Sequence, residues 1–434
     1  MVEGATDIIL DTMRTTGLRY DEGPDIGGDH GPYIQSERKA IYAEYAKRLV
    51  EKGFAYYCFC SKERLDSLHA EDANGGYDRH CRDLPQEEVD RLLASGQPYV
   101  IRQKIPLSGR TSYTDAVFGE IATDNAEMQD QILMKADGYP TYNFAHVVDD
   151  HLMGVTHVVR GSEYLTSTPK YVLLYDAFGW ERPVYVHLPL LMGRNEDGSI
   201  SKLSKRHGAV SFADLLADGY LPEAIVNYIA LLGWCRKGSE EEFYTLQDLE
   251  RYFTIDGINK SPSVFDYDKL LWFNGEYIRR MPFDAFCQAV RRFVRTPLPP
   301  NVDQEGVFRL LQGRLTRLSE AEEKTGIFRA LPEYDTALME NRKNKVTMEL
   351  ARRILKEAEP VLRALPTWEN ESLYACMLGL SDTLGCKSGA VLWCMRIAVA
   401  GQAVTPGGAT EIMAVIGREE SLRRLAISLA KLGE

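Results

Sequence analysis

The chain has 434 residues, of which 44% are hydrophobic and 26% are charged, so it is long enough for about three globular domains. No apolar run reaches the roughly 18–20 residues needed to cross a bilayer, and the N-terminal segment "MVEGATDIILDTMRTTG" lacks the features of a secretory signal. Eight cysteines in a chain of this length exclude a disulfide framework, and we therefore expect a cytoplasmic protein.

The net charge of −12 is distributed unevenly along the chain. Residues 1–275 have a net charge of −15, whereas residues 276–434 carry 23 Lys and Arg against 20 Asp and Glu, a net charge of +3. A polyanion such as nucleic acid would therefore meet its most favourable surface in the C-terminal part. This distribution permits nucleic-acid binding but is not diagnostic of it.

Two amphipathic helices are predicted near the N-terminus. In "VEGATDIILDTMRTTG" the apolar residues recur at helical spacing and Gly17 follows as a stop signal, and "SERKAIYAEYAKRLVEKG" (36–53) ends in the same way. A cysteine-containing stretch comes next, followed by the strand-forming segment "PYVIRQKIP" (98–106).

A strand–helix–strand pattern covers residues 155–191. The run 155–160 is rich in β-branched residues, Thr168 is expected to cap a helix that has Pro169 at its first position, and "VYVHLPLL" (184–191) is the second strand. Such a βαβ unit implies a parallel sheet and an α/β domain. Beyond residue 210 the pattern is helical almost throughout.

The segment "SISKLSKRHGAVSF" (199–212) places Lys202, Lys205 and Arg206 around Ser204. These three cations form either a solvated surface turn or a mobile clamp for a phosphate group. The segment follows a predicted strand, on the side of an open α/β sheet where ligands bind. We call residues 199–212 the basic loop.

The basic loop resembles the KMSKS signature of class I aminoacyl-tRNA synthetases, and "KLSKRHGAVS" is similar to its glutamyl-tRNA synthetase form. Three further segments match the bacterial glutamyl-tRNA synthetase family in the same order: "YIQSER" (33–38), "GYPTYNFAHVVDDHLMGVTHVVRGSEYLTSTPK" (138–170) and "TPGGATEI" (405–412). The resemblance therefore covers nearly the whole chain. It implies ATP-dependent ligation of L-glutamate to tRNA(Glu) through a glutamyl-adenylate, with Mg²⁺ accompanying ATP.

The same resemblance implies the domain organisation. A Rossmann-like catalytic domain with an incomplete first βα unit would contain residues 1–53 and 139–200. An inserted domain that binds the tRNA acceptor stem, and that carries a zinc site, would contain residues 54–138. Residues 201–275 would hold the KMSKS loop and a helical stem-contact domain, and residues 276–434 an all-helical anticodon-binding domain.

The resemblance also assigns roles to the basic loop. Lys205, Lys202 and Ser204 would be catalytic, and Lys205, Lys202 and Arg206 would bind ATP, with Lys205 as the main residue. Negative charge builds up on the leaving pyrophosphate when a carboxylate attacks the α-phosphate, so cations placed there stabilise the transition state more than the ground state.

Four residues fall at the positions where the family contacts substrate glutamate: Tyr142, His146, Arg160 and Tyr164. Arg160 stands at the end of a predicted buried strand, where an unpaired cation is costly, so we expect it to have an anionic partner. The alternative to a substrate carboxylate is a structural ion pair with a neighbouring acid: Asp149, Asp150 or Glu163. The alternative for Tyr142 is that its side chain packs in the hydrophobic core instead of contacting glutamate.

Three cysteines, Cys58, Cys60 and Cys81, lie close together in the segment expected to form the insertion. Three thiols across a short irregular loop suit a structural zinc ion, and some family members bind zinc here. Tyr77 or Asp83 would be the fourth ligand, and His80 is adjacent. The alternative is free thiols that pack as small hydrophobic side chains, which we expect for the remaining cysteines: Cys235, Cys287, Cys376, Cys386 and Cys394.

The second signature of class I synthetases, HIGH or a variant such as H-x-G-N, does not occur around any of the eight histidines. We therefore expect a chain that is truncated at its N-terminus, lacks part of the phosphate cradle and has little aminoacylation activity alone. It would be either a shortened form of a normal enzyme or a natural paralogue that binds tRNA without making the adenylate.

Two related activities are less compatible with the chain. Glutaminyl enzymes of this subclass carry β-barrel anticodon domains, whereas residues 276–434 look helical, and a glutamyl-queuosine enzyme would lack this region. Lys and Arg of "NRKNK" (341–345) are candidate phosphate contacts. We expect a monomer that binds tRNA(Glu), L-glutamate and ATP, without a membrane partner.

Overall fold

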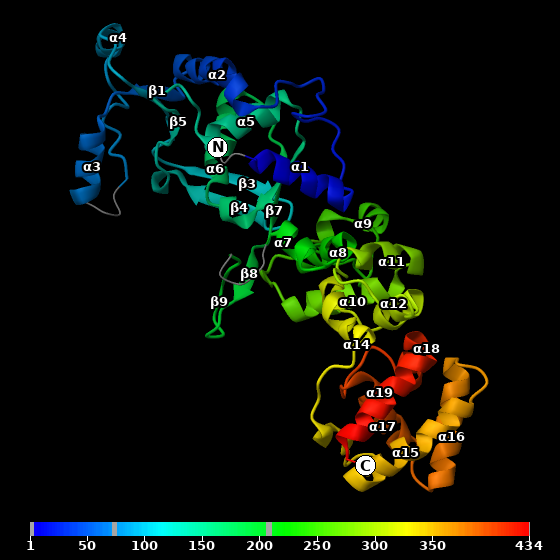
Figure 1. Cartoon of the computed structure of the whole chain (residues 1–434). Helices are drawn as coiled ribbons and strands as arrows, with labels where there is room; N and C mark the ends of the chain where they lie inside the picture. Colours follow the sequence, from blue (N-terminus) through cyan, green and yellow to red (C-terminus); the bar gives the residue numbers. More distant parts are fainter. Residues whose placement is uncertain (1–3, 72–75, 205–210, 434) are drawn as a thin grey trace. The chain divides into compact units, whose positions relative to one another are not determined.

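The computed structural model describes residues 4–71, 76–204 and 211–433 (Figure 1). The chain divides into two compact units. The N-terminal unit comprises residues 1–203 and 229–265, and the C-terminal unit comprises residues 204–228 and 266–434. Each unit is described by itself below.

The N-terminal unit combines helices with short strands (Figure 1). Its helices are α1 (Ala5–Thr16), α2 (Lys39–Glu51), α3 (Lys62–Glu71), α4 (Gln86–Ala94), α5 (Tyr142–Leu152), α6 (Thr168–Phe178) and α9 (Leu246–Tyr252). Its strands are β1 (Ala55–Cys58), β2 (Val100–Gln103), β3 (Arg110–Asp115), β4 (Gly119–Asp124), β5 (Ile132–Met134), β6 (His157–Gly161), β7 (Val184–Leu188), β8 (Leu191–Arg194), β9 (Ile200–Lys202) and β10 (Ser263–Val264).

The predicted βαβ unit is confirmed as β6–α6–β7, with β6 and β7 parallel. They belong to a four-stranded sheet of order β4-β3-β7-β6, in which β3 is parallel to β7 and antiparallel to β4. The β3–β4 hairpin lies in the range 54–138, which the sequence assigns to the insertion. This sheet therefore draws strands from the ranges expected to form both the inserted and the catalytic domains.

A second sheet of order β1-β2-β5 is antiparallel and packs against α2 and α5. Fully buried Tyr42 and Leu49 from α2 share a hydrophobic core with Phe144 and Val147 from α5. This packing fixes the N-terminal end of α5, where two of the predicted glutamate-binding residues lie.

The third sheet, of order β10-β8-β9, was not predicted. The basic loop follows the predicted strand 184–191, but its first residues are themselves a strand, because β9 pairs with β8 in a hairpin. Strand β9 ends at Lys202, inside the basic loop. Three-residue strands carry too little alternation for a sequence pattern to reveal them.

The start of α6 also differs from the prediction. The N-cap is Ser167, so Thr168 is the first helical residue and Pro169 the second. Thr168 is completely buried, and its hydroxyl lies 2.9 Å from the carbonyl oxygen of Tyr164. The prediction that Thr168 caps the helix is therefore wrong by one residue, whereas the stop of α1 at Gly17, which has a φ of 76°, is confirmed.

The C-terminal unit is helical in its described residues (Figure 1). Its helices are α7 (Phe212–Ala217), α10 (Tyr267–Arg280), α11 (Phe283–Arg291), α12 (Gln304–Gln312), α13 (Ala321–Lys324), α14 (Gly326–Arg329), α15 (Met348–Ala364), α16 (Asn370–Leu384), α17 (Ser388–Ala400), α18 (Ala409–Ile416) and α19 (Arg418–Lys431), and it includes the first part of α8 (Pro222–Gly233).

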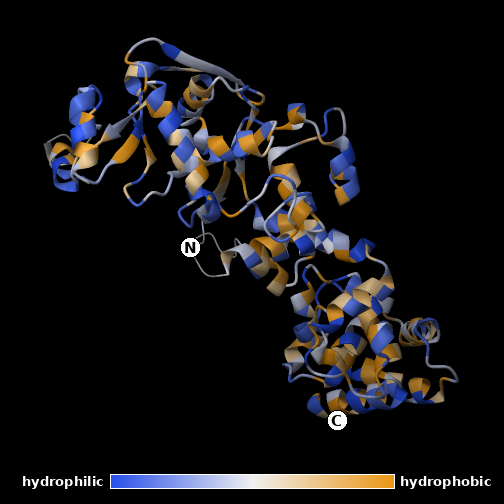
Figure 2. Cartoon of the chain, turned by 90° about the horizontal axis from the view of Figure 1, so that it is seen from above, coloured by the Kyte–Doolittle hydropathy of each residue, from blue (hydrophilic) through white to orange (hydrophobic). Residues whose placement is uncertain are grey.

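Hydrophobic and hydrophilic residues alternate around the helices of this unit, as Figure 2 shows. In α15 the buried face consists of Ala351, Ile354, Leu355, Ala358 and Leu362, which confirms the predicted amphipathic helix. Among the helices in the described residues, none combines the length and apolar composition needed to span a bilayer.

Candidate functional site

The four predicted glutamate-binding residues come together in the N-terminal unit. Tyr142 is the first residue of α5, and His146 follows one helical turn later. Arg160 lies near the end of β6, and Tyr164 closes the short 3-10 turn that follows. The ring of Tyr142 lies 5.2 Å from that of His146 and 5.7 Å from that of Tyr164, between ring centres.

The guanidinium of Arg160 is surrounded by aromatic rings. Its central carbon lies 5.0 Å from the ring centre of Tyr164 and 4.7 Å from that of Tyr171. Nη2 donates a hydrogen bond to the hydroxyl of Thr168 at 3.2 Å, whereas Nε is buried and has no hydrogen-bond partner among the described residues. Cation–π contacts hold the guanidinium in place without neutralising it.

The neighbouring carboxylates do not neutralise Arg160, because each is occupied elsewhere. Asp149 accepts from Nε of Arg38 at 2.8 Å, Asp150 lies 3.2 Å from Nδ1 of His146, and Glu163 lies 3.2 Å from Nζ of Lys202. Within the described residues Arg160 thus forms no ion pair, so the alternative of a structural ion pair is wrong. A buried donor without a partner favours an anion supplied by a ligand.

His146 presents a second unsatisfied atom to the same place. Its Nε2 is buried and lacks a hydrogen-bond partner among the described residues, and its ring meets Tyr171 edge-on at 4.4 Å between ring centres. Tyr142 is 54% exposed, so the alternative that this side chain belongs to the core is also wrong. The imidazole of His146 and the rings of Tyr142, Tyr164 and Tyr171 therefore gather around Arg160.

Sequence reasoning missed the residues that support this cluster. The hydroxyl of Tyr171 donates to Oδ1 of Asn143 at 2.6 Å, and Nδ2 of Asn143 donates to Oε1 of Gln131 at 3.0 Å. Burial raises the pKa of Tyr171 to about 12, so its phenol keeps the proton that it donates. These bonds join segments 12 and 28 residues apart, and no local pattern reveals such pairs.

The basic loop is described only in part. Nζ of Lys202 is paired with Glu163, and both side chains are largely exposed. Ser204 is the last residue before the gap, whereas Lys205 and Arg206 lie outside the described residues. The predicted roles of these residues in ATP binding therefore stay predictions.

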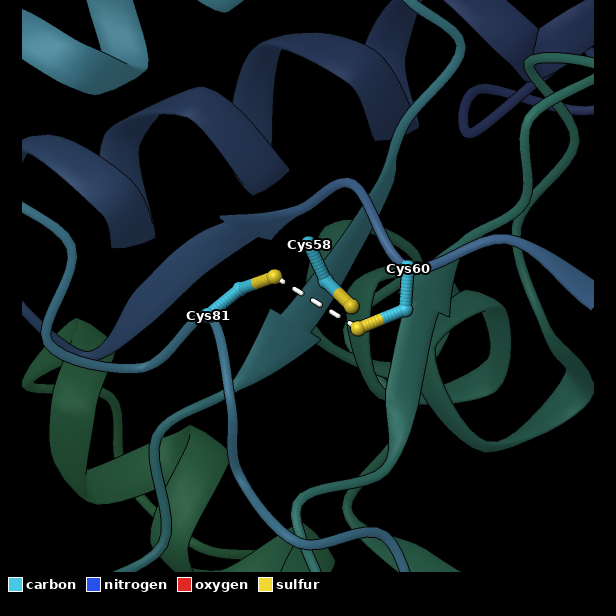
Figure 3. Close-up of side chains that lie close together, drawn as sticks. All are labelled: Cys58, Cys60 and Cys81. Carbon is cyan, nitrogen blue, oxygen red and sulfur yellow. Dashed lines mark hydrogen bonds between the residues drawn. The ribbon is translucent and has the colours of Figure 1, made fainter. Parts of the chain in front are cut away.

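The three predicted zinc ligands also come together, as Figure 3 shows. The sulfur atoms of Cys58, Cys60 and Cys81 all lie within 4.8 Å of one another, and Cys58 and Cys81 are buried. The hydroxyl oxygen of Tyr77 is 3.2 Å from Sγ of Cys58 and 3.7 Å from Sγ of Cys60. Asp83, in contrast, is 79% exposed at its side chain and pairs with Lys104.

The contacts among the thiols act in opposite directions on two of them. Hydrogen bonds, first from Cys81 and then from Tyr77, lower the pKa of Cys58, whereas the hydrogen bond with Cys58 raises the pKa of Cys81. The thiolate is the form that binds a metal, so Cys58 is the thiol best prepared to bind one. The guanidinium of Arg102 lies over the ring of Tyr77, with 3.9 Å from its central carbon to the ring centre. Three sulfur atoms and a phenol oxygen in this arrangement fit Zn²⁺.

The other five cysteines are free. Cys394 is buried, and burial raises the pKa of its thiol to about 12, as expected of a thiol that packs as a small hydrophobic side chain. Cys235 is exposed, so that expectation is wrong for this residue.

Comparison with known proteins agrees with this architecture. Residues 1–272 match the family described as tRNA synthetases class I (E and Q), catalytic domain, and residues 269–429 match the anticodon binding domain. The glutamate–tRNA ligase of Clostridium botulinum (strain Hall) is 50% identical over 436 residues, which cover 100% of this chain and 89% of that protein. The glutamate–tRNA ligase of Clostridium tetani is 49% identical, over 99% and 88%.

Solved structures give the same result. The crystal structure of a glutamate tRNA ligase from Elizabethkingia meningosepticum in complex with its amino acid has a TM-score of 0.88 at 29% identity, covering 99% of this chain and 90% of that one. The glutamate–tRNA synthetase of Elizabethkingia anophelis gives the same values. The chain therefore belongs to the glutamate–tRNA ligases, class I tRNA synthetases that join a catalytic domain to an anticodon-binding domain.

Proposed function

We propose that this chain recognises L-glutamate through Arg160 and serves the ATP-dependent ligation of glutamate to tRNA(Glu) through a glutamyl-adenylate. The observation that carries the proposal is the state of Arg160, whose guanidinium lies among aromatic rings with a buried, unpartnered Nε and no ion pair among the described residues. A carboxylate can accept two parallel hydrogen bonds from the planar guanidinium.

The side-chain carboxylate of glutamate is the group that Arg160 would bind. Glutamine offers a neutral amide there, with one acceptor and an NH₂ group whose hydrogens would face those of the guanidinium. A cation held away from other acids therefore discriminates against glutamine. The rings of Tyr142 and Tyr164 would flank the methylene groups, and Nε2 of His146 would contact a polar group of the substrate.

The basic loop would serve the other half of the reaction. Lys205, with Lys202 and Arg206, would stabilise the pyrophosphate that leaves the α-phosphate of ATP–Mg²⁺, and Ser204 would contact the same phosphates. Lys202 must first leave Glu163, and this exposed pair is weak enough to open at little cost.

We assign Cys58, Cys60, Cys81 and Tyr77 as the residues that would hold a structural zinc ion. The ion would cross-link the segment 58–81, which has few hydrophobic side chains of its own to pack. This assignment selects Tyr77 over Asp83, because the hydroxyl of Tyr77 lies among the thiols whereas Asp83 is exposed.

The helical region 276–434 would bind the tRNA anticodon, with cations on its surface contacting phosphates. Eight free cysteines suit the reducing cytoplasm, where we infer that the protein works. A monomeric state stays a prediction, which sedimentation would test.

Substitution of Arg160 tests the proposed function. We expect Arg160→Gln to raise the Kd for L-glutamate by about 100-fold, because a charge-assisted bidentate bond is lost, while the much weaker affinity for L-glutamine changes little. Isothermal titration calorimetry measures both constants. Arg182→Gln, which removes an exposed arginine paired with Asp176, is the matched control. Unchanged glutamate affinity in Arg160→Gln would refute the assignment.

A further inference from the structure

Behind Arg160 lies a buried polar chain that the roles assigned so far do not use. His187 of β7 is the register partner of Arg160 of β6, and Asp115 of β3 is the partner of Tyr185, two residues before His187. Because side chains two residues apart share a face of a sheet, Asp115, His187 and Arg160 lie on the same face. His187 and Asp115 are essentially inaccessible to solvent.

Asp115 fixes the tautomer of His187. Oδ1 of Asp115 accepts the backbone N–H groups of Val117 and Phe118 at 2.9 and 2.8 Å, and Oδ2 lies 2.6 Å from Nδ1 of His187. The carboxylate can only accept at this position, so Nδ1 carries the hydrogen. In the neutral ring, Nε2 is then an acceptor.

Nε2 of His187 in turn faces the hydroxyl of Thr168, at 3.3 Å. That hydroxyl has a single hydrogen and two lone pairs, and it also contacts the carbonyl oxygen of Tyr164 at 2.9 Å and Nη2 of Arg160 at 3.2 Å. The carbonyl oxygen of Tyr164 can only accept, so the hydroxyl hydrogen goes to it. A lone pair of the hydroxyl then accepts from Nη2 of Arg160, while the imidazole of His187 lies against the hydroxyl from another side.

We propose that Thr168, whose hydroxyl lies between the carbonyl oxygen of Tyr164 and the imidazole of His187, is a positioning residue for glutamate recognition, which fixes the guanidinium of Arg160. This inference rests on the proposed role of Arg160. The cation–π contacts hold the guanidinium near the rings, and the directional hydrogen bond to Thr168 restricts its rotation further. Nε is buried without a partner, so a substrate carboxylate that reaches it would complete its hydrogen bonding.

The test compares variants that remove the hydroxyl with variants that keep it. Thr168→Val should raise the Kd for L-glutamate about tenfold, equal to about 1.4 kcal/mol, and change the Kd for L-glutamine less than about twofold. Thr168→Ser should restore glutamate affinity. His187→Asn retains a donor toward Asp115 but removes the imidazole that lies against Thr168, and should raise the Kd for glutamate about fivefold.

Thr111→Val is the matched control, because it removes a buried threonine hydroxyl in the same sheet, bonded to Asn125 at 2.6 Å and without contact to Arg160. Thermal melts report any general loss of stability. Glutamate affinities of Thr168→Val and His187→Asn equal to that of the control would overturn the inference, provided Arg160→Gln is impaired. If Arg160→Gln binds glutamate normally, both the inference and the proposed function are wrong.

Discussion

At the scale of single residues, the proposed amino-acid site contains buried polar atoms that lack partners. Nε of Arg160 and Nε2 of His146 are buried without hydrogen-bond partners among the described residues, and the acids near Arg160 are engaged by other residues. An unpaired buried donor costs about 1–3 kcal/mol, which a bound carboxylate would return. Binding of a carboxylate at Arg160 would therefore be favoured by the hydrogen bond that its Nε gains.

The buried imidazole of His187 predicts a pH dependence of stability. The pKa of His187 is lowered, and burial is the largest cause. The hydrogen bond and charge of Asp115 oppose this shift, the charge of Arg160 adds to it, and the charge of Glu163 opposes it. The unfolded chain, with a histidine pKa of about 6.5, then takes up the proton more readily than the folded one. This contribution to stability is present above about pH 6.5 and is lost as the pH falls below it.

Thermal melts between about pH 5 and 8 check this prediction. The melting temperature of the wild-type protein should fall more steeply toward acidic pH than that of His187→Gln. Parallel pH profiles for the two proteins would contradict the neutral state of the buried imidazole.

The proposed role of Tyr77 as the fourth zinc ligand gives another prediction at this scale. Tyr77→Phe removes only the hydroxyl that lies 3.2 Å from Sγ of Cys58, so we expect zinc affinity to fall by roughly 10–100-fold. Asp83→Asn should leave it unchanged, because that side chain is exposed and paired with Lys104. Competition with a chromophoric chelator measures the affinities. If Asp83→Asn instead lost zinc affinity and Tyr77→Phe did not, Asp83 would be the ligand.

At the scale of elements, the proposed zinc site is connected to the first strand of the antiparallel sheet. Cys58 is the last residue of β1, and Cys60 and Cys81 frame α3. Removal of zinc with a chelator should therefore increase amide hydrogen exchange in residues 55–84 while leaving α15 protected. Mass spectrometry resolves the two regions, and equal exchange with and without chelator in residues 55–84 would contradict a structural ion.

The buried face of α15 gives a prediction about the stability of the C-terminal unit. Leu355 is completely buried in the hydrophobic core of the C-terminal unit, so Leu355→Ala should lower the free energy of unfolding of that unit by about 2–5 kcal/mol. Lys356→Ala, at the next and exposed position, should change it by less than about 0.5 kcal/mol. Urea unfolding followed by circular dichroism compares the two variants. Similar unfolding midpoints would contradict the burial of Leu355 in this core.

The elements that the sequence predicts correctly are those with long periodic patterns. Helix α15 and the β6–α6–β7 unit follow from spacing and stop signals, because hydrophobic periodicity determines which face is buried. The β8–β9 hairpin and the pairing of β3 with β7 were not predicted, since short strands pair through contacts distant in the sequence. For the same reason the motif indicated Arg160, but not His187 or Asn143 behind it.

At the scale of the whole molecule, different parts of the chain correspond to recognition of the amino acid and of the tRNA anticodon. The N-terminal unit contains the residues that would select the amino acid, and residues 269–429 match the anticodon-binding domain. Residues 276–434 also have a net positive charge in an otherwise acidic chain. Contacts between cations and phosphates release counterions, so binding of tRNA should weaken as salt rises.

The most direct test of tRNA recognition is to measure equilibrium binding of labelled tRNA(Glu) to the 434-residue chain. A tRNA with an unrelated anticodon is measured for comparison, and both are titrated over roughly 50–500 mM salt. We expect tighter binding of tRNA(Glu) at every salt concentration and a linear fall of the logarithm of the association constant with the logarithm of salt concentration. Equal affinity for the two tRNAs, or no binding at the lowest salt, would contradict a chain built to deliver glutamate to its own tRNA.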